Sequence, residues 1–399
     1  MQDSFIIDGV RTGIGSFRGT LSAIRTDDLA SHVLDQLMNR NHQLDPAALD
    51  DVIMGCANQA GEDNRNVARM ALLLAGLPWT IPGETVNRLC ASGMAAVVHA
   101  HRAIQAGDGD LFISGGVENM TRGPWVMSKS GTPFGSDVEM HDSSFGWRFI
   151  NPRMAALYGT EAMGETAENL AEIYTISRAD QDLFAYRSQM KAVAGVQHRA
   201  EEMIPISIPR KKQDPLVFLT DEFVKGHTTP DGLAVLKPAF RENGSVTAGN
   251  SSGLNDGAAA ILIASEFAVR QHSLTPMARI ISSAVVGVEP RIMGIGPVGA
   301  SQKALKKAGL QLADMDIIEI NEAFAAQVLA CTRTLGLADD DPRINVNGGA
   351  IALGHPLGMS GTRIILTAAR SLQRTGGKYA LVTMCIGVGQ GYAVVMERQ

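Results

Sequence analysis

Two side chains of this sequence have the types and surroundings of a nucleophile and a base. Cys90 follows an apolar, strand-like run and precedes a helical run from about Ala91 to Ala106. The positive end of a helix dipole favours the thiolate of a cysteine at a helix N-terminus. Cys90 is therefore a candidate nucleophile, although free cysteines are also common as small core residues.

His355 is the candidate base. Gly348, Gly349 and Gly354 precede it, and Pro356 fixes the backbone after it, so the imidazole is expected at the mouth of the next helical run. Histidine is the side chain best suited to accept a proton near pH 7. The alternative is a hydrogen-bonded core histidine.

A second cysteine and an asparagine complete the candidates. Cys385 opens a stretch that ends at Gly391, contains three glycines and lies between two predicted strands. Glycines beside a thiol let a ligand lie against the backbone. This thiol can also move a proton that neither Cys90 nor His355 is placed to move. Asn321 follows a strand-like run, where its amide either orients a water towards a developing oxyanion or caps a turn.

The elements that position these residues occur twice. His355 lies 265 positions after Cys90, and Asp316 lies 265 positions after Asp51, in segments of similar character. Each half alternates strand-like runs with helical patterns, which is typical of layered α/β proteins. The helical runs after Cys90 and His355 are apolar on nearly all sides, which indicates burial. We therefore predict two sheets around a central helical layer.

A different stretch, from about residue 121 to 248, separates the two copies. It begins rich in Gly, Pro and Ser, continues as a helical run from Thr166 to about Glu202, and ends polar and Pro-rich. We interpret it as an insertion over one face of the core, where substrate contacts are common. The predicted domains are residues 1–274, with this insertion at about 121–248, and residues 275–399.

Composition and spacing exclude several other classes. The chain has 399 residues, 45% hydrophobic, and a net charge of −6, so it is globular and has no basic face for nucleic acid. No apolar stretch approaches the ~20 residues of a membrane span. Four cysteines without a Cys-x-x-Cys pair and the lack of a signal peptide favour a reducing cytoplasm. His99 and His101 are two apart on a predicted helix, which makes a poor metal pair, and no metal is expected.

Four motifs together resemble the thiolase family: Asn87–Gly93, Asn321–Phe324, Gly348–Gly361 and Cys385–Gly391. The resemblance covers essentially the whole chain. It implies the duplicated, five-layered αβαβα thiolase fold with an inserted loop domain, usually as a homotetramer. It also implies coenzyme A and acyl-CoA as substrates, with no tightly bound cofactor.

The same resemblance implies the roles of individual residues. Cys90 matches the nucleophile that becomes acylated, and Cys385 matches the acid and base at the substrate α-carbon. His355 matches the base that activates Cys90 and later coenzyme A. Asn321, through a water, and His355 match one oxyanion hole, while the backbone N–H groups of Cys90 and Gly387 match a second. Six residues match positions that contact coenzyme A or line its pocket: Ser252, Lys225, Met163, Phe240, Ala248 and Phe324.

Three further features bear on the substrate. Ala162 stands where acetoacetyl-CoA-forming thiolases carry a histidine, which argues against that role. The segments Ala57–Asn66 and Gly146–Pro152 are similar to β-ketoadipyl-CoA thiolases of aromatic-compound breakdown, whose substrate ends in a carboxylate. Arginine recognises carboxylates well, so Arg148 or Arg65 is the expected partner. The predicted reaction is thiolytic cleavage of 3-oxoadipyl-CoA to succinyl-CoA and acetyl-CoA.

Several alternatives remain open at this stage. Within the family they are an acetyl-CoA C-acetyltransferase and a 3-ketoacyl-CoA thiolase of fatty-acid β-oxidation. A decarboxylating condensing enzyme usually combines one catalytic cysteine with two histidines, or with one histidine and one asparagine. The second cysteine, Cys385, therefore argues against this class. A non-catalytic thiolase-like acyl or lipid carrier would tolerate the loss of Cys90 or His355, and both are present. The coenzyme A motifs disfavour a general cysteine hydrolase.

Overall fold

Two sheets of the same design form the frame of the molecule. The structure is a computed structural model that describes residues 2–399. The first sheet contains, in spatial order, β4 (Gly83–Val86), β3 (Asp51–Gly55), β5 (Leu111–Asn119), β10 (Asn255–Ser265) and β1 (Ser4–Arg11). The second contains β12 (Ile317–Ile320), β13 (Tyr379–Ile386), β14 (Gln390–Arg398) and β11 (Ala278–Gly287). The two sheets join edge to edge through a short antiparallel pairing of β1 with β11.

The pairing pattern repeats between the halves. β3 runs parallel to β5, as β12 does to β13, and β5 runs antiparallel to β10, as β13 does to β14. Asp50 accepts hydrogen bonds from two backbone N–H groups at the start of β5, and Asp316 accepts two at the start of β13. The predicted match of Asp51 with Asp316 is therefore wrong by one residue, and Asp50 is the counterpart.

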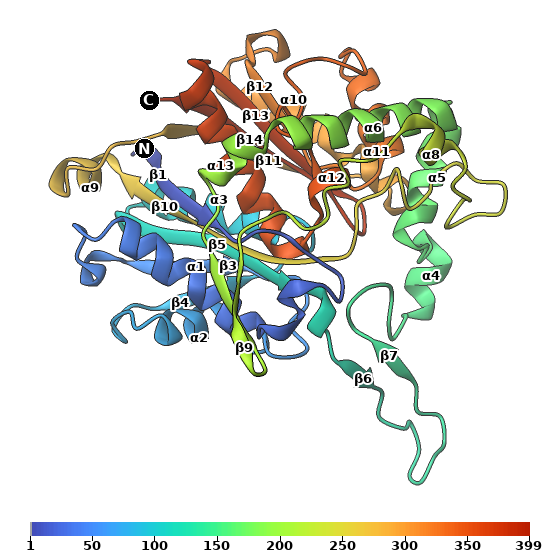
Figure 1. Ribbon diagram of the computed structural model, residues 1–399, viewed down its shortest axis with the longest axis horizontal. Helices are drawn as coiled ribbons and strands as arrows, with labels where there is room; N and C mark the ends of the chain where they lie inside the picture. Colours follow the sequence, from blue (N-terminus) through green and yellow to red (C-terminus); the bar gives the residue numbers. More distant parts are fainter. Residues whose placement is uncertain (1) are drawn as a thin grey trace.

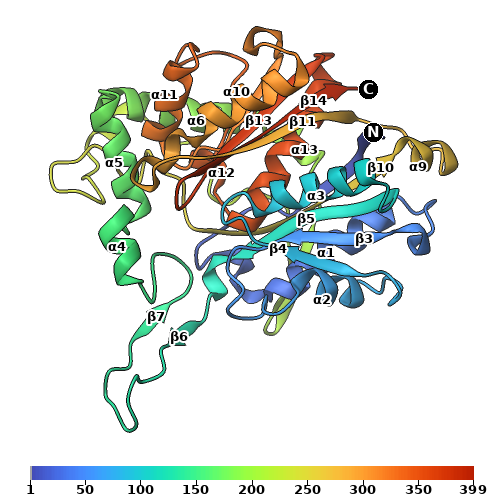
Figure 2. The same ribbon diagram turned by 180° about the vertical axis from the view of Figure 1, so that it is seen from behind.

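Helices complete five layers, which confirms the predicted αβαβα fold (Figures 1 and 2). The central layer consists of α3 (Ser92–Ala106) and α13 (Leu357–Thr375), which pack on each other between the sheets. The outer face of the first sheet carries α1 (Thr26–Arg40) and α2 (Val67–Leu74). The outer face of the second carries α10 (Gly296–Ala308) and α11 (Ala325–Thr334). Both predicted buried helices thus lie in the central layer.

Glycine lets the two central helices approach each other at their N-terminal ends. A Cβ atom on Gly93 would lie 2.4 Å from the carbonyl oxygen of Gly358. A Cβ atom on Gly358 would in turn lie 2.2 Å from the carbonyl oxygen of Val117. Because no side chain fits at either position, the starts of α3 and α13 lie against the end of β5. This contact brings the two candidate residues that precede these helices into one region.

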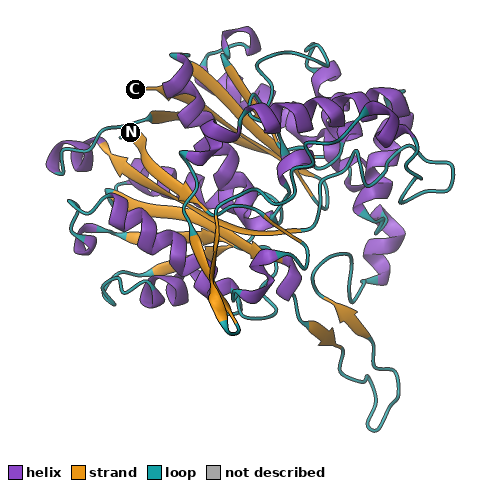
Figure 3. Cartoon of the chain, viewed as in Figure 1, coloured by secondary structure: helices purple, strands orange, loops and turns teal. Residues whose placement is uncertain are grey.

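The insertion packs partly beside the second half and partly, through residues 204–218, against the first half, and it carries an arm that extends away from the core (Figures 1 and 3). The predicted continuous helix from Thr166 to Glu202 is wrong. The chain instead forms α5 (Met163–Ile173), α6 (Arg178–Ala194) and α7 (Val196–Ala200), with breaks at Thr175, which has a φ of 50°, and at Gly195. α5 and α6 pack against α11 and α12 (Ala350–Leu353). The insertion also contains β6 (Trp125–Met127), β7 (Met140–Asp142), α4 (Pro152–Tyr158), β8 (Ile206–Arg210), β9 (Gln213–Phe218) and α8 (Pro230–Ala234).

The remaining elements are short. They are β2 (Gly15–Ser16), which pairs with β10, and α9 (Glu266–Gln271), which follows β10. The boundary proposed between residues 274 and 275 falls between α9 and β11. Among residues 2–399, no helix combines the length and the apolar character that crossing a bilayer requires.

Candidate active site

Cys90 lies on a tight turn directly ahead of α3. Leu89 has a φ of 48°, a conformation that side chains rarely adopt, and its N–H donates to Oδ1 of Asn87 at 2.9 Å. The side-chain amide of Asn87 donates to the carbonyl oxygen of Ala57 at 2.9 Å, on the loop after β3. The asparagine therefore fixes the strained residue before Cys90 against the end of the first sheet.

The Cys90 thiol is protonated at neutral pH, which corrects the expectation of a favoured thiolate. Burial raises its pKa to about 11, against the smaller opposite effect of hydrogen bonds from the backbone N–H groups of Gly387 and of Cys90 itself. α3 begins two residues later, at Ser92, so its dipole acts less directly than expected. The thiol therefore needs a base to become a nucleophile.

His355 has the tautomer and the charge state of such a base. Its Nδ1 lies 2.6 Å from Oγ of Ser360, which donates to the carbonyl oxygen of Pro356 at 2.8 Å. Nδ1 therefore carries the proton, and Nε2 is unprotonated, with its lone pair accepting a hydrogen bond from the side-chain nitrogen of Asn321 at 3.3 Å. Burial, with a smaller effect from Arg363, lowers the pKa of His355 to about 3, so the ring is neutral and accepts a proton.

Asn321 adds an unused acceptor beside the imidazole. The residue directly follows β12 and is fully buried, with its N–H donating to the carbonyl oxygen of Thr383 at 3.0 Å. Its side-chain nitrogen faces His355, while its Oδ1 has no hydrogen-bond partner in the protein. A buried amide oxygen of this kind requires a partner, so a water or a polar ligand group fits next to it.

Cys385 lies inside β13 rather than between two strands, where it was expected. It pairs with Gly391 of β14, because the strand continues to Ile386 before the chain turns. Burial raises the pKa of its thiol, with the neighbouring Cys90 as a second cause, so this thiol is also neutral. Gly387 opens the turn, and a Cβ there would lie 3.5 Å from Leu89 and 3.7 Å from the sulfur of Met163, so its Cα faces the site.

The residues expected to contact coenzyme A fall into two groups. Lys225 and Ala248 line a cavity of about 310 Å³ together with Phe223, His227, Leu236 and Gly249. Met163 and Phe324 pack in one apolar cluster with Cys385, and the ring of Phe240 stands edge-on to Phe324 at 6.0 Å. Ser252 links the two groups, because its N–H donates to the carbonyl oxygen of Ala323, the residue before Phe324, at 2.9 Å.

The two arginines proposed for the substrate carboxylate have different surroundings. The guanidinium of Arg148 donates to the carbonyl oxygen of Ser143 at 3.2 Å, and Asn58 donates to the same oxygen at 3.1 Å. Asn58 adjoins Ala57, which holds Asn87 before the Cys90 turn. Arg65 is exposed, with a φ of 64°. The structure thus connects Arg148, but not Arg65, to the candidate site.

Sequence reasoning missed three residues that shape the site. Ser360 lies in the first turns of α13, five positions after His355, and a hydroxyl so close in sequence was a usable signal. Asn255 accepts a hydrogen bond from the N–H of His355 at 2.9 Å, across 100 positions of sequence that offer no local signal. Glu118, at the end of β5, accepts three backbone N–H groups from two other elements.

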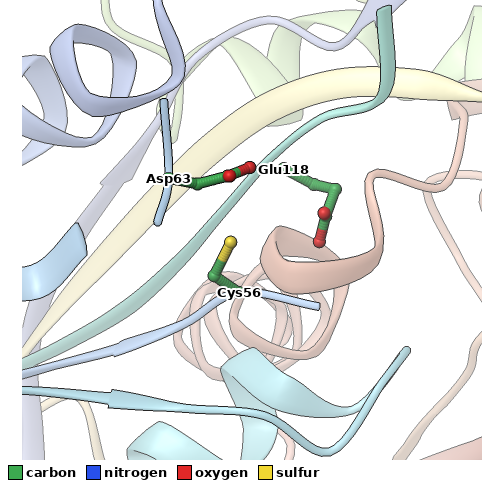
Figure 4. A group of neighbouring side chains, drawn as sticks. All are labelled: Cys56, Asp63 and Glu118. Carbon is green, nitrogen blue, oxygen red and sulfur yellow. The ribbon is translucent and has the colours of Figure 1, made fainter. Parts of the chain in front are cut away.

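Cys56, Asp63 and Glu118 form a compact cluster in which the potential ligand atoms lie within 4.8 Å of one another (Figure 4). Each already has a partner. The Cys56 thiol donates to the carbonyl oxygen of Asn58 at 3.1 Å, and Asp63 accepts from the N–H of Gly61 at 2.9 Å. Burial raises the pKa of all three groups, which disfavours the charged forms that bind metals. The cluster is therefore better described as a hydrogen-bonded hub than as a metal site.

Cys90 and the neutral imidazole of His355 stand ahead of two helices whose first turns touch, and the Cys385 thiol neighbours Cys90. Two thiols and a neutral imidazole gathered in one region are suited to covalent acyl transfer. The chain belongs to the thiolase family: residues 4–267 match the thiolase N-terminal domain and residues 274–398 match the thiolase C-terminal domain. It is therefore an acyltransferase, a coenzyme-A-dependent thiolase.

The full length of the chain is similar to named members of this family. It is 56% identical, over 100% of both chains, to the "3-oxoadipyl-CoA/3-oxo-5,6-dehydrosuberyl-CoA thiolase" of Escherichia coli (strain K12). It is also 56% identical, over 100% of both chains, to a "Beta-ketoadipyl-CoA thiolase" of Acinetobacter baylyi. The crystal structure of human mitochondrial 3-ketoacyl-CoA thiolase in complex with CoA matches with a TM-score of 0.91 and 41% identity, over 100% of this chain and 98% of that chain.

Proposed function

We propose that this thiolase cleaves 3-oxoadipyl-CoA with coenzyme A to give succinyl-CoA and acetyl-CoA. The observation that carries the chemistry is that a Cys90 thiol, hydrogen-bonded by the N–H of Gly387, and a His355 whose Nε2 is unprotonated stand ahead of two helices whose first turns touch. The full-length relatives named for this substrate support the choice of acyl group.

The first half-reaction breaks the C2–C3 bond. Cys90 transfers its proton to Nε2 of His355, and its sulfur attacks the C3 carbonyl, whose oxygen takes the negative charge. The N–H groups of Cys90 and Gly387 stabilise this oxyanion. As the bond breaks, the electron pair moves to the acetyl-CoA enolate, whose oxygen is stabilised by His355 and by a water on Asn321. Cys385 then protonates the α-carbon, and acetyl-CoA leaves.

The second half-reaction releases the remaining acyl group. A proton passes from His355 to the Cys385 thiolate, which restores both residues. His355 then takes the proton of an incoming coenzyme A thiol, and the sulfur attacks the thioester on Cys90. The collapse of this second adduct forms succinyl-CoA and returns the proton to Cys90. The net change is the transfer of one thiol proton to the methyl group of acetyl-CoA.

Two surfaces are proposed to bind the ends of the substrate. Arg148 would pair with the terminal carboxylate, because its guanidinium is anchored at Ser143 and retains free N–H donors. Arg65 is the second candidate for this role. Coenzyme A would occupy the cavity at Lys225 and Ala248, where the ammonium group suits a phosphate. Its pantetheine arm would run past the other predicted contacts: Ser252, Met163, Phe240 and Phe324.

The assembly and location are also proposals. The arm formed by β6 and β7 extends away from the core (Figure 1). Its exposed apolar side chains, Trp125, Met127, Phe134 and Met140, suit contact with further copies of the chain. We infer a homotetramer that acts in the cytoplasm on small acyl-CoA molecules. Light scattering of the purified protein tests the oligomeric state directly.

The first experiment compares coenzyme-A-dependent cleavage of 3-oxoadipyl-CoA and acetoacetyl-CoA, with Cys90→Ala as the blank. We expect a strong preference for 3-oxoadipyl-CoA, and a loss of that preference in Arg148→Ala but not in Arg65→Ala. A preference for acetoacetyl-CoA would retain the thiolase and reject the carboxylate site. An unchanged preference in both arginine variants would reject both candidates.

A further inference from the structure

Glu118 receives an unusual set of hydrogen bonds for a buried carboxylate. One oxygen accepts the N–H groups of Ala57 at 3.0 Å and Gly358 at 2.8 Å, and the other accepts the N–H of Asn58 at 2.9 Å. All three donors are backbone groups, from the loop after β3 and from the first turn of α13. The side chain therefore joins the two halves of the molecule at one point (Figure 4).

Each of these bonds leads to a reacting group. Gly358 is three residues after His355, and α13 has no side-chain cap of its own, so the carboxylate also caps that helix. On the other side, the carbonyl oxygen of Ala57 holds Asn87, which in turn fixes the turn at Leu89. A chain of three hydrogen bonds thus connects Glu118 to Leu89, and one hydrogen bond connects it to Gly358, three residues after His355.

We propose that ionised Glu118 is a positioning residue that keeps the Cys90 turn and the His355 loop at the separation that proton transfer between the two side chains requires, which we call the working separation. This inference rests on the proposed roles of Cys90 and His355. The physical reason is the number of donors. An ionised carboxylate can accept hydrogen bonds from all three N–H groups, whereas a protonated carboxyl carries an O–H that faces one of these donors and cannot accept from it. Loss of one of these bonds frees either the loop after β3 or the start of α13.

The charge on Glu118 is expected to change near neutral pH. Burial outweighs the three N–H groups and raises its pKa to about 7. The titratable groups around it are Asp63 and Cys56 on the β3 side and the Cys90 thiol ahead of α3, while its ladder partner on β10 is Gly257. As the pH falls through about 7, Glu118 gains a proton, so the working separation is expected to be lost in that range.

The test compares Glu118→Gln with the wild type and with Asp63→Asn, a control from the same cluster that accepts only from the loop around Gly61. We expect Glu118→Gln to lower kcat by about 100-fold at pH 8, with KM changed by less than about threefold, because misplacement of reacting groups acts mainly on the chemical step. Asp63→Asn should stay near the wild-type value. Circular dichroism of each variant checks that it folds.

The measurement specific to positioning is the ratio of the wild-type kcat to the kcat of Glu118→Gln, followed across pH. This ratio should be near its maximum of about 100 at pH 8 and fall to about ten at pH 6, where only about a tenth of wild-type Glu118 is ionised. Alkylation of Cys90 by iodoacetamide should show the same decline of the ratio. A ratio that does not vary with pH, or an equal loss in Asp63→Asn, would overturn the proposal.

Two measurements separate this proposal from the proposed function. If Glu118→Gln does not fold, the wild-type protein still tests the idea, because its kcat must fall as the pH drops below about 7, and a profile flat to pH 5 would reject it. If no 3-oxoacyl-CoA is cleaved, the proposed function fails, while the alkylation ratio still decides the role of Glu118.

Discussion

The two halves of the molecule share one frame but carry opposite chemistry at the same place. Cys90 and His355 each stand two residues before a central helix, α3 or α13. In the first half the turn is made by Leu89, with a φ of 48°, and in the second by Gly354, with a φ of 106°. The duplicated frame thus places a thiol and an imidazole at equivalent points of the two halves, which are the proposed nucleophile and the proposed base.

The surroundings of the two positions differ in polarity. The first turn of α3 packs among apolar residues, whereas α13 carries Ser360, and later Arg363, on its buried side. Ala95 and Val98 occupy the corresponding positions of α3. A thiol needs little orientation, because its sulfur presents lone pairs in several directions. An imidazole works only in one tautomer and one ring orientation, so the second half supplies hydrogen bonds that the first half lacks.

The largest expected effect comes from removing either member of the pair. Cys90→Ala and His355→Ala should each lower kcat/KM by about 10⁵-fold, and the double variant should lose little more, because the two act as a unit. Steady-state cleavage of 3-oxoadipyl-CoA measures this. Cys331→Ala, which removes a buried thiol that donates to the carbonyl oxygen of Gly294, is the control. Losses that multiply in the double variant would show that the halves act independently.

A smaller effect is expected when the second half loses its other reactive group. Cys385→Ala should lower carbon–carbon cleavage by about 10³-fold, since it removes one proton transfer. Acetyl transfer from acetyl-CoA to Cys90 should continue, because it needs only Cys90 and His355. Trapping of the labelled acetyl-enzyme, beside the cleavage assay, separates the two reactions. Full cleavage activity in this variant would assign the α-carbon proton to another group.

Local patterns predicted the frame, and they singled out the candidate reacting residues, because each is marked by neighbours in sequence. The apolar run before Cys90 and the glycines before His355 are visible without any tertiary contact. The internal repeat then placed both at equivalent points of two halves. Even the one-residue error between Asp51 and Asp50 arose because both are acidic and adjacent, and only hydrogen bonding to β5 distinguishes them.

Properties that depend on distant contacts could not be predicted in this way. Burial in the folded protein raises the pKa of Cys90, and the opposing hydrogen bond comes from Gly387, almost 300 positions away, so the helix dipole alone suggested the wrong charge state. Asn255 holds the backbone of His355 from a strand of the other half. Arg148 and Arg65 looked equivalent in sequence, and only the contact with Ser143 distinguishes them. Charge state and orientation are properties of the assembled core.

The smallest effect is expected where the polarity difference between the halves is removed. Ser360→Ala makes this position of α13 match Ala95 of α3, and it takes away the acceptor of the His355 Nδ1 proton. Loss of one hydrogen bond of about 1 kcal/mol should lower kcat by about 5- to 10-fold. Because His355 serves both half-reactions, acylation and deacylation should fall by similar factors in single-turnover measurements.

The matched control is Ser371→Ala, since Ser371 lies on the same helix and bonds Asn347 and Arg374 rather than the imidazole. That variant should leave both half-reactions unchanged. If Ser360→Ala slowed only one half-reaction, His355 would need its orienting bond in that step alone, and the ring would have to turn between steps. If neither step slowed, packing alone would orient the imidazole, and the two halves would differ in their reacting atoms but not in how they hold them.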